Sequence, residues 1–183
     1  IWYRDKDIAA LTKDECAALR RTDIGVVFQD HNIINELTVL ENVRLPLEAN
    51  GMSRTAAITA SEQALAKVGI GHLGRRFPAE ISGGERQRVG IARALADQPA
   101  VLLCDEPTSA LDPETTRSIL ELIRDVRDRL GVTVVIITHE MSVVRAVCDS
   151  VSLLEAGRVV ESGPIEDVVA DVASRLSREL VPV

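Results

Sequence analysis

A short apolar run that ends in two adjacent carboxylates is the feature that most restricts how this chain can fold. It reads VLLCDE over Val101–Glu106, and a second apolar run follows at Val132–Thr138. The segment between them opens with PETT and predicts a helix over 113–130, because proline is favoured in the first helical turn. Strands that alternate with helices pair in parallel through right-handed crossovers. We therefore expect an α/β protein with a mostly parallel sheet flanked by helices.

Other segments carry similar local signals. The β-branched run Ile24–Gln29 predicts a strand, and Ala156-Gly157 predicts the turn of a hairpin over 150–160. A charged helical tail is expected after the hairpin. The remaining predicted helices begin at N-cap residues: Thr12, with Glu15 completing a capping box; Ser53, in a helix that ends at Val68; and Ser82, in a helix that ends before Pro99.

Composition limits the function classes. A length of 183 residues with 46% hydrophobic content predicts one compact domain, and 2% aromatic content leaves Ala, Val, Leu and Ile to build the core. The net charge of −7 argues against nucleic acid as the main partner, because phosphate backbones need a cationic surface. No apolar run approaches the roughly 20 residues that span a bilayer, so a membrane role would be peripheral. Three widely spaced cysteines without metal-ligand spacing favour a reducing, cytoplasmic setting.

The two carboxylates lie at the carboxyl end of a predicted strand, where open α/β sheets bind ligands. Asp105 is suited to holding Mg²⁺ on a phosphate, and Glu106 to orienting an attacking water for phosphoryl transfer. A solvated acidic turn is the plainer interpretation of an apolar run followed by DE. The continuation PTSALD, which ends at Asp112, favours the phosphate site.

A glycine pair at a predicted helix start is the second candidate. Residues Ser82, Gly83, Gly84 and Glu85 would leave backbone N–H groups open at the positive end of the helix dipole, which favours an anion such as a terminal phosphate. An ordinary serine cap with a Gly-Gly turn is the alternative. The place of this motif, one helix ahead of the acidic strand, favours the anion site.

Two single residues complete the candidate site. His139 follows a predicted strand and is suited to donating to a γ-phosphate or holding a catalytic water; a neighbour of a helix cap without a chemical role is the alternative. Gln29, at the end of its predicted strand, would reach metal or water with its amide, although such a glutamine is more often a surface group.

Together these residues resemble the nucleotide-binding subunits of ATP-binding cassette (ABC) transporters, across essentially the whole chain. The resemblance implies an ABC-type P-loop NTPase fold with an inserted helical subdomain over 38–97, a catalytic core over 98–165 and a C-terminal helical tail over 166–183. The matching segments are Gln29 with the Q-loop, ISGGERQ at 81–87 with the signature, VLLCDE with the Walker B strand, SALD at 109–112 with the D-loop, and His139 with the switch histidine.

The resemblance also implies roles and partners. Glu106 would be the general base with His139 beside it, Asp105 and Gln29 would serve Mg²⁺, and Gln29, Asp112 and Ser82–Glu85 would bind ATP. Two copies would sandwich two nucleotides, so that the signature of one subunit meets the ATP of the other. A transmembrane permease would dock on the segment from Gln29 to Leu47 and the helical subdomain, with an extracytoplasmic substrate-binding protein in the complex. The expected location is the cytoplasmic face of the bacterial cell membrane.

The pattern departs from the family at one important point. No GxxxxGK followed by Ser or Thr occurs, although that loop holds the nucleotide phosphates. We therefore expect an N-terminally truncated chain that binds and hydrolyses ATP weakly or not at all by itself. Isoleucine and glutamate at positions 81 and 85 replace the commonest leucine and glutamine of the signature, and this variation weakens the resemblance only slightly.

The transported substrate is less well specified. The run over 116–164, with LLCDE and GIARALA, is most similar to ATPase subunits of methionine importers. DEPTSALD, with Pro107 in place of the alanine common in that group, is shared with polar-amino-acid importers and with lipoprotein-release and cell-division ATPases. We expect an importer ATPase for methionine or another amino acid; a non-import ABC ATPase or an inactive fragment is the alternative.

Overall fold

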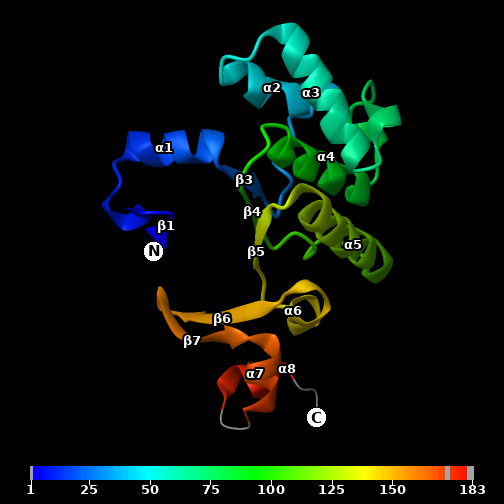
Figure 1. Cartoon of the computed structure of the whole chain (residues 1–183). Coiled ribbons are helices and arrows are strands. Elements are labelled where there is room, and N and C mark those ends of the chain that lie inside the picture. Colours follow the sequence, from blue (N-terminus) through cyan, green and yellow to red (C-terminus); the bar gives the residue numbers. More distant parts are fainter. Residues whose placement is uncertain (1, 172–173, 181–183) are drawn as a thin grey trace. The chain divides into compact units, whose positions relative to one another are not determined.

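The computed structural model describes residues 2–171 and 174–180 and contains two compact units, Ile1–Ile137 and Thr138–Val183 (Figure 1). The first unit holds the parallel sheet and the helices that pack on it. The second holds a β-hairpin and short helices. The subdomain boundaries predicted at 97/98 and 165/166 stay predictions.

A three-stranded parallel sheet forms the centre of the first unit, as predicted. Its strands are β3 (Ile24–Val27), β4 (Val101–Asp105) and β5 (Thr133–Ile137), in the order β3-β4-β5. The predicted strand that leads to the acidic pair is β4, which ends at Asp105. The prediction for β3 was two residues too long, because the chain turns after Val27 and the His31 N–H donates to the Phe28 carbonyl at 3.2 Å.

The two faces of this sheet differ in burial. Leu102 and Cys104 are fully buried in the main core beside α4 (Gly83–Leu95) and α5 (Pro113–Leu130). On β5 the outward residues Val135 and Ile137 remain 44% and 50% exposed. Side chains alternate between faces along a strand, so β4 sends Leu103 and Asp105 to the face opposite the core.

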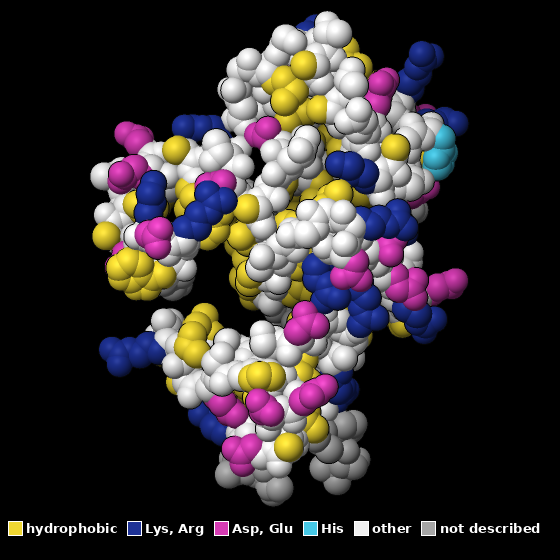
Figure 2. Space-filling view, viewed as in Figure 1, with side chains coloured by type: hydrophobic (Ala, Val, Ile, Leu, Met, Phe, Trp, Pro, Cys, Tyr) yellow, Lys and Arg dark blue, Asp and Glu magenta, His cyan; other side chains and the backbone are white. Residues whose placement is uncertain are grey.

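Close approach of β3 to α4 depends on Gly25. A β-carbon at this position would lie 2.4 Å from the Ala94 carbonyl oxygen, which is backbone and cannot turn away. The apolar side of α5 buries Ile119, Ile123 and Val126, whereas Figure 2 shows acidic and basic side chains intermixed over its outer surface. Helix α5 is therefore amphipathic, and it keeps the predicted bounds.

Two helices that lie side by side pack against α4 and extend the first unit (Figure 1): α2 (Val39–Ala49) and α3 (Arg54–Lys67). Short 3-10 turns, η2 (Gly71–Leu73) and η3 (Pro78–Glu80), connect α3 to α4. The helix predicted from Ser53 is confirmed. No individual helix was predicted over 39–49; the Thr38 capping box with Glu41 marks its start, but Pro46 stands inside it, where proline usually breaks a helix.

The N-terminal part of the first unit is small. Strands β1 (Trp2–Tyr3) and β2 (Lys6–Asp7) pair antiparallel, and η1 (Ile8–Ala10) follows. Helix α1 (Lys13–Thr22) then packs on β3. Its predicted capping box between Thr12 and Glu15 is present.

The second unit contains α6 (Met141–Val147), β6 (Ser150–Glu155), β7 (Arg158–Pro164), α7 (Ile165–Ala170) and α8 (Arg175–Leu180). The predicted hairpin turns at Ala156 and Gly157, whose φ angles of 47° and 77° suit a two-residue turn between antiparallel strands. Its small core contains Val144, Val168, Leu176 and Leu180. In the part of the chain that the structure describes, no helix is long and apolar enough to cross a membrane.

Candidate functional site

Asp105 and Glu106 lie at the carboxyl edge of β4. Asp105 is exposed at the last position of the strand. Glu106 is half-buried and has a φ of 45°, in the left-handed region that non-glycine residues rarely adopt. Its N–H donates to the Ile137 carbonyl at 2.9 Å, and the Ser109 hydroxyl donates to its carbonyl at 3.2 Å. Hydrogen bonds on both sides therefore hold a strained backbone at the acidic pair.

Gln29 leaves the sheet at the same edge. Val27 of β3 pairs with Cys104 of β4, so Gln29 and Asp105 follow neighbouring strands in the same direction. Among the described residues no cluster of three or more His, Cys, Asp or Glu side chains forms a ready metal cage. Mg²⁺ on a nucleotide usually needs only one or two protein oxygens beside phosphates and waters. An exposed carboxylate and a nearby amide fit that requirement.

The loop after Gln29 is held against α4. His31 and Asn32 both have positive φ angles, 60° and 50°. The Arg93 guanidinium donates to the His31 carbonyl at 2.8 Å and to the Asn32 carbonyl. The His31 side chain meets the Gly83 carbonyl, with Nε2 and oxygen 3.3 Å apart. Two side chains thus connect this loop to the body and the start of one helix.

Asn42 of α2 holds the far end of the same loop. Its side chain is buried, its Oδ1 accepts from the Ile34 N–H at 2.8 Å, and its Nδ2 contacts the carbonyls of Ile34, Leu37 and Thr38 at 3.0–3.1 Å. Because the loop is bonded to α4 near one end and to α2 at the other, a change in its position would affect both helices.

The predicted cap of α4 is confirmed. The Ser82 hydroxyl accepts from the Glu85 N–H, and the Glu85 carboxylate accepts from the Ser82 N–H at 2.7 Å and from its hydroxyl at 2.8 Å. These bonds, the backbone one foremost, hold the pKa of Glu85 below its usual value. The side chains of Ser82 and Glu85 therefore bond within the cap. The backbone N–H groups of Gly83 and Gly84 remain as the donors at this helix start.

The start of α5 lies against the start of α4. A β-carbon on Gly83 would meet Leu111 at 3.8 Å, and one on Gly84 would lie 2.5 Å from Thr115 Cγ2. Asp112 caps α5: its Oδ1 accepts from the N–H groups of Glu114 and Thr115, and its Oδ2 from the Thr115 hydroxyl at 2.5 Å. The hydroxyl bond is the main cause that lowers the pKa of Asp112. The structure thus brings Asp112 beside the predicted anion site.

His139 lies in the second unit, exposed, between the end of β5 and the start of α6. The predicted place between a strand and a helix is confirmed. Its chemical role stays a prediction.

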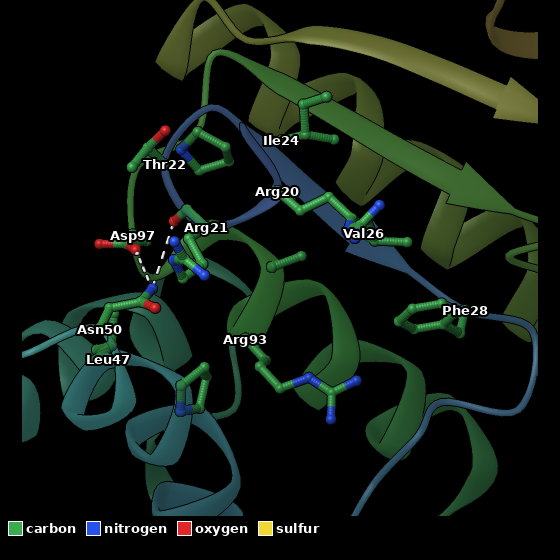
Figure 3. Close-up of a pocket in the computed structure, with 14 residues that line it drawn as sticks. Arg20, Arg21, Thr22, Ile24, Val26, Phe28, Leu47, Asn50, Arg93 and Asp97 are labelled. Carbon is green, nitrogen blue, oxygen red and sulfur yellow. Dashed lines mark hydrogen bonds between the residues drawn. The ribbon is translucent and has the colours of Figure 1, made fainter. Parts of the chain in front are cut away.

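A pocket of about 270 Å³ opens between α1, β3, α2 and α4 (Figure 3). Ile24, Val26, Phe28, Leu47 and the prolines 46 and 99 make it apolar, and Phe28 is 41% exposed. Its charged lining residues are Arg20, Arg21, Arg93 and Asp97, so the pocket is basic although the chain carries a net charge of −7. Asn50 spans one side, donating to the Asp97 carboxylate at 2.9 Å.

Sequence reasoning missed His31, Asn42, Arg93 and Thr115. Each acts on residues distant in the sequence or on a backbone carbonyl, which no local motif reveals. The one available signal was the placement of His31 directly after the Gln29 turn.

Comparison with known proteins identifies what the chain is similar to. The family pattern described as ABC transporter matches residues 1–109. The "Methionine import ATP-binding protein MetN" of Streptomyces griseus is 51% identical over 183 residues, which cover 97% of this chain and 51% of that protein. The protein of the same name from Cupriavidus metallidurans is 49% identical over 176 residues, which cover 96% of this chain and 51% of that protein.

A solved structure shows the same likeness in three dimensions. It is the dimeric post-hydrolysis state of an ATP-binding cassette with ADP and phosphate bound, with a TM-score of 0.75 and 35% identity. The match covers 89% of this chain and 72% of that one. The chain spans about half the length of the curated relatives that it matches.

Proposed function

The chain belongs to the ABC transporter family, and from this premise we propose that its protein is the ATP-hydrolysing subunit of an importer for methionine or another amino acid. The observation that carries the proposal is that the strands leading to Gln29 and to Asp105–Glu106 end at the same edge of the sheet, with a glycine pair at the start of α4. Relatives named as methionine import ATP-binding proteins support the substrate.

Each residue at the sheet edge has a role that suits its position. Glu106 accepts the proton of the water that attacks the terminal phosphate of ATP, and hydrogen bonds of its N–H and carbonyl hold its backbone in place. Asp105 and Gln29 supply oxygens for Mg²⁺, which neutralises phosphate charge when bound. The role expected for His139, to orient the water or the phosphate, stays a prediction.

The start of α4 serves a phosphate through its backbone. Gly83 and Gly84 offer N–H groups at the positive end of a helix of 13 residues. Ser82 and Glu85 support this site by capping the helix, and Asp112 by holding the start of α5 beside it. In the proposed dimer this face meets the ATP of the second copy, in keeping with the dimeric cassette that the chain resembles.

The basic pocket between α1 and α2 is the proposed docking surface for the permease. A cytoplasmic permease segment with apolar and acidic side chains suits its apolar lining and its three arginines. The permease would bring the subunit to the cytoplasmic face of a bacterial cell membrane, in a complex that also uses a substrate-binding protein outside. Pro46 and Leu47 of this pocket belong to the segment predicted to dock the permease, and Phe28 directly precedes that segment.

Substitution of Glu106 tests the enzymatic proposal. In the protein expressed from its complete gene, Glu106→Gln keeps the shape of the side chain but removes its ability to accept a proton. We expect ATP turnover to fall at least about a hundredfold, in the range of general-base catalysis, while ATP binding persists and an ATP-bound dimer accumulates. Phosphate release and size-exclusion chromatography with ATP measure the two effects.

Glu121→Gln is the matched control, because Glu121 is exposed on the outer surface of α5 and loses the same charge. It should hydrolyse ATP at the rate of the unmodified protein. Equal turnover by the Glu106 and Glu121 variants would show that the base has been assigned to the wrong residue.

A further inference from the structure

The side chain of His31 makes a contact that the ATPase chemistry above does not use. Its Nε2 lies 3.3 Å from the carbonyl oxygen of Gly83, across 52 positions of sequence. A carbonyl oxygen only accepts hydrogen bonds, so Nε2 carries the hydrogen in this contact.

The acceptor belongs to the peptide group that carries one of the proposed anion donors. A peptide group is planar and trans, so the Gly83 carbonyl and the Gly84 N–H lie in one rigid plane and point in opposite directions. Because a glycine stands on each side of this peptide plane, there is little steric resistance to its rotation. A carbonyl has two lone pairs, and helical bonding uses one of them. A second partner on the Gly83 oxygen therefore helps to set the direction of the Gly84 N–H.

The backbone that carries the imidazole is itself held in place. Arg93 donates to the carbonyls of His31 and Asn32, and the His31 N–H donates to the Phe28 carbonyl. Gly90 of α4 lies next to this loop, because a β-carbon added to it would be 3.7 Å from the His31 carbonyl oxygen. The ring thus projects from a loop whose backbone is bonded directly to the body of α4.

We propose that His31 is a positioning residue that ties the loop after Gln29 to the Gly83–Gly84 peptide and so aims the Gly84 N–H at a bound phosphate. This inference rests on the proposed ATP site at Ser82–Gly84. It adds that the loop beside one nucleotide sets the donor geometry at the start of α4, which serves the other nucleotide of the dimer.

Two substitutions separate the hydrogen bond from the shape of the loop. Glutamine places its amide nitrogen near the position of Nε2, whereas asparagine ends near the position of Nδ1 and falls short of the Gly83 oxygen. Asparagine also tolerates a positive φ, so His31→Asn should keep the turn while it removes the tie. Equal melting temperatures of the two variants would confirm that both are folded.

Hydrogen–deuterium exchange without nucleotide tests the tie in the protein expressed from its complete gene. We expect faster amide exchange over residues 83–87 in His31→Asn, and exchange like that of the unmodified protein in His31→Gln. With Mg²⁺ and ATP, kcat/KM should fall about three- to tenfold in His31→Asn, the effect of one hydrogen bond, and stay within about twofold in His31→Gln.

Identical exchange over 83–87 in the two variants would overturn the proposal, as would altered exchange with an unchanged kcat/KM. The exchange comparison needs no ATP hydrolysis. If the unmodified protein did not hydrolyse ATP, the proposed ATPase function would be wrong, while the exchange data would still show whether His31 fixes the Gly83–Gly84 peptide.

Discussion

Gly83 and Gly84 are neighbours at the start of α4, yet only one has room for a side chain. A β-carbon on Gly84 would lie 2.5 Å from Thr115 Cγ2, whereas one on Gly83 would meet Leu111 at an ordinary 3.8 Å. Thr115 cannot rotate away without losing the 2.5 Å bond from its hydroxyl to Asp112. Gly84→Ala should therefore destabilise the protein by about 1–3 kcal/mol, the usual cost of overpacking, as measured by urea unfolding.

The control for this prediction lies one residue away. Gly83→Ala should leave stability unchanged or raise it by up to about 1 kcal/mol, because alanine favours a helix over glycine. Thr115→Ser removes the clashing methyl group and keeps the hydroxyl, so it should restore most of the loss when combined with Gly84→Ala. Equal stability of the two single alanine variants would contradict the close contact.

At the scale of elements, local signals in the sequence were sufficient where an element caps itself. The capping box at Thr12, the N-cap serine at Ser82 and the proline at the start of α5 placed three helices correctly, because the bonds involved span a few residues. Helix α2 was missed since Pro46 lies inside it. The pocket was missed as well, because its lining comes from four elements that only tertiary packing brings together.

That pocket carries an element-scale prediction. Arg20 projects from the last turn of α1 and lines the pocket together with Val26 of β3 (Figure 3). If a permease segment with acidic side chains docks there, Arg20→Glu should weaken the complex about tenfold at low salt and less at high salt, because ions screen exposed charges. Binding of the ATPase to its purified permease in nanodiscs, followed by light interferometry, measures the effect.

Arg117→Glu is the matched charge reversal outside both the pocket and the predicted helical subdomain, at an exposed position of α5. It should bind the permease like the unmodified protein. If both reversals weaken binding equally, the effect comes from overall charge and the pocket is not the docking surface.

At the scale of the whole molecule, the sequence predicted the parallel sheet, the acidic edge and the glycine pair, because each is encoded by adjacent residues. It did not predict how the loop after Gln29 is fixed, since His31 and Arg93 bond to backbone groups with no sequence signature. Long-range contacts to carbonyls depend on where the chain passes, and only the folded structure supplies that.

A second property of the whole molecule is that hydrogen bonds in the folded state lower the pKa of several carboxyl groups. For most of these groups the main cause of the lower pKa is a hydrogen bond from the backbone N–H of an N-cap residue. For the others the main cause is a hydrogen bond from a serine or threonine hydroxyl. The groups whose pKa is lowered in this way are Glu15, Glu41, Glu80, Glu85, Asp112 and Glu161.

These shifts predict sensitivity to acid. A group whose folded pKa lies below its unfolded value stabilises the fold above the unfolded pKa, about 4.3 for glutamate, and loses that contribution as the pH falls through the folded pKa. The melting temperature should therefore hold between about pH 7 and 5 and decline below about pH 4.5, as followed by circular dichroism. Replacing Glu15, Glu41 and Glu80 with glutamine should flatten the decline, because glutamine can accept the same capping bonds without titrating.

The exposed residues Glu36, Glu62 and Glu121 provide a triple glutamine variant with the same charge change outside the capping boxes. That variant should lose stability in acid as steeply as the unmodified protein. Equal flattening in both triple variants would show that net charge, and not the bonded carboxylates, controls acid unfolding.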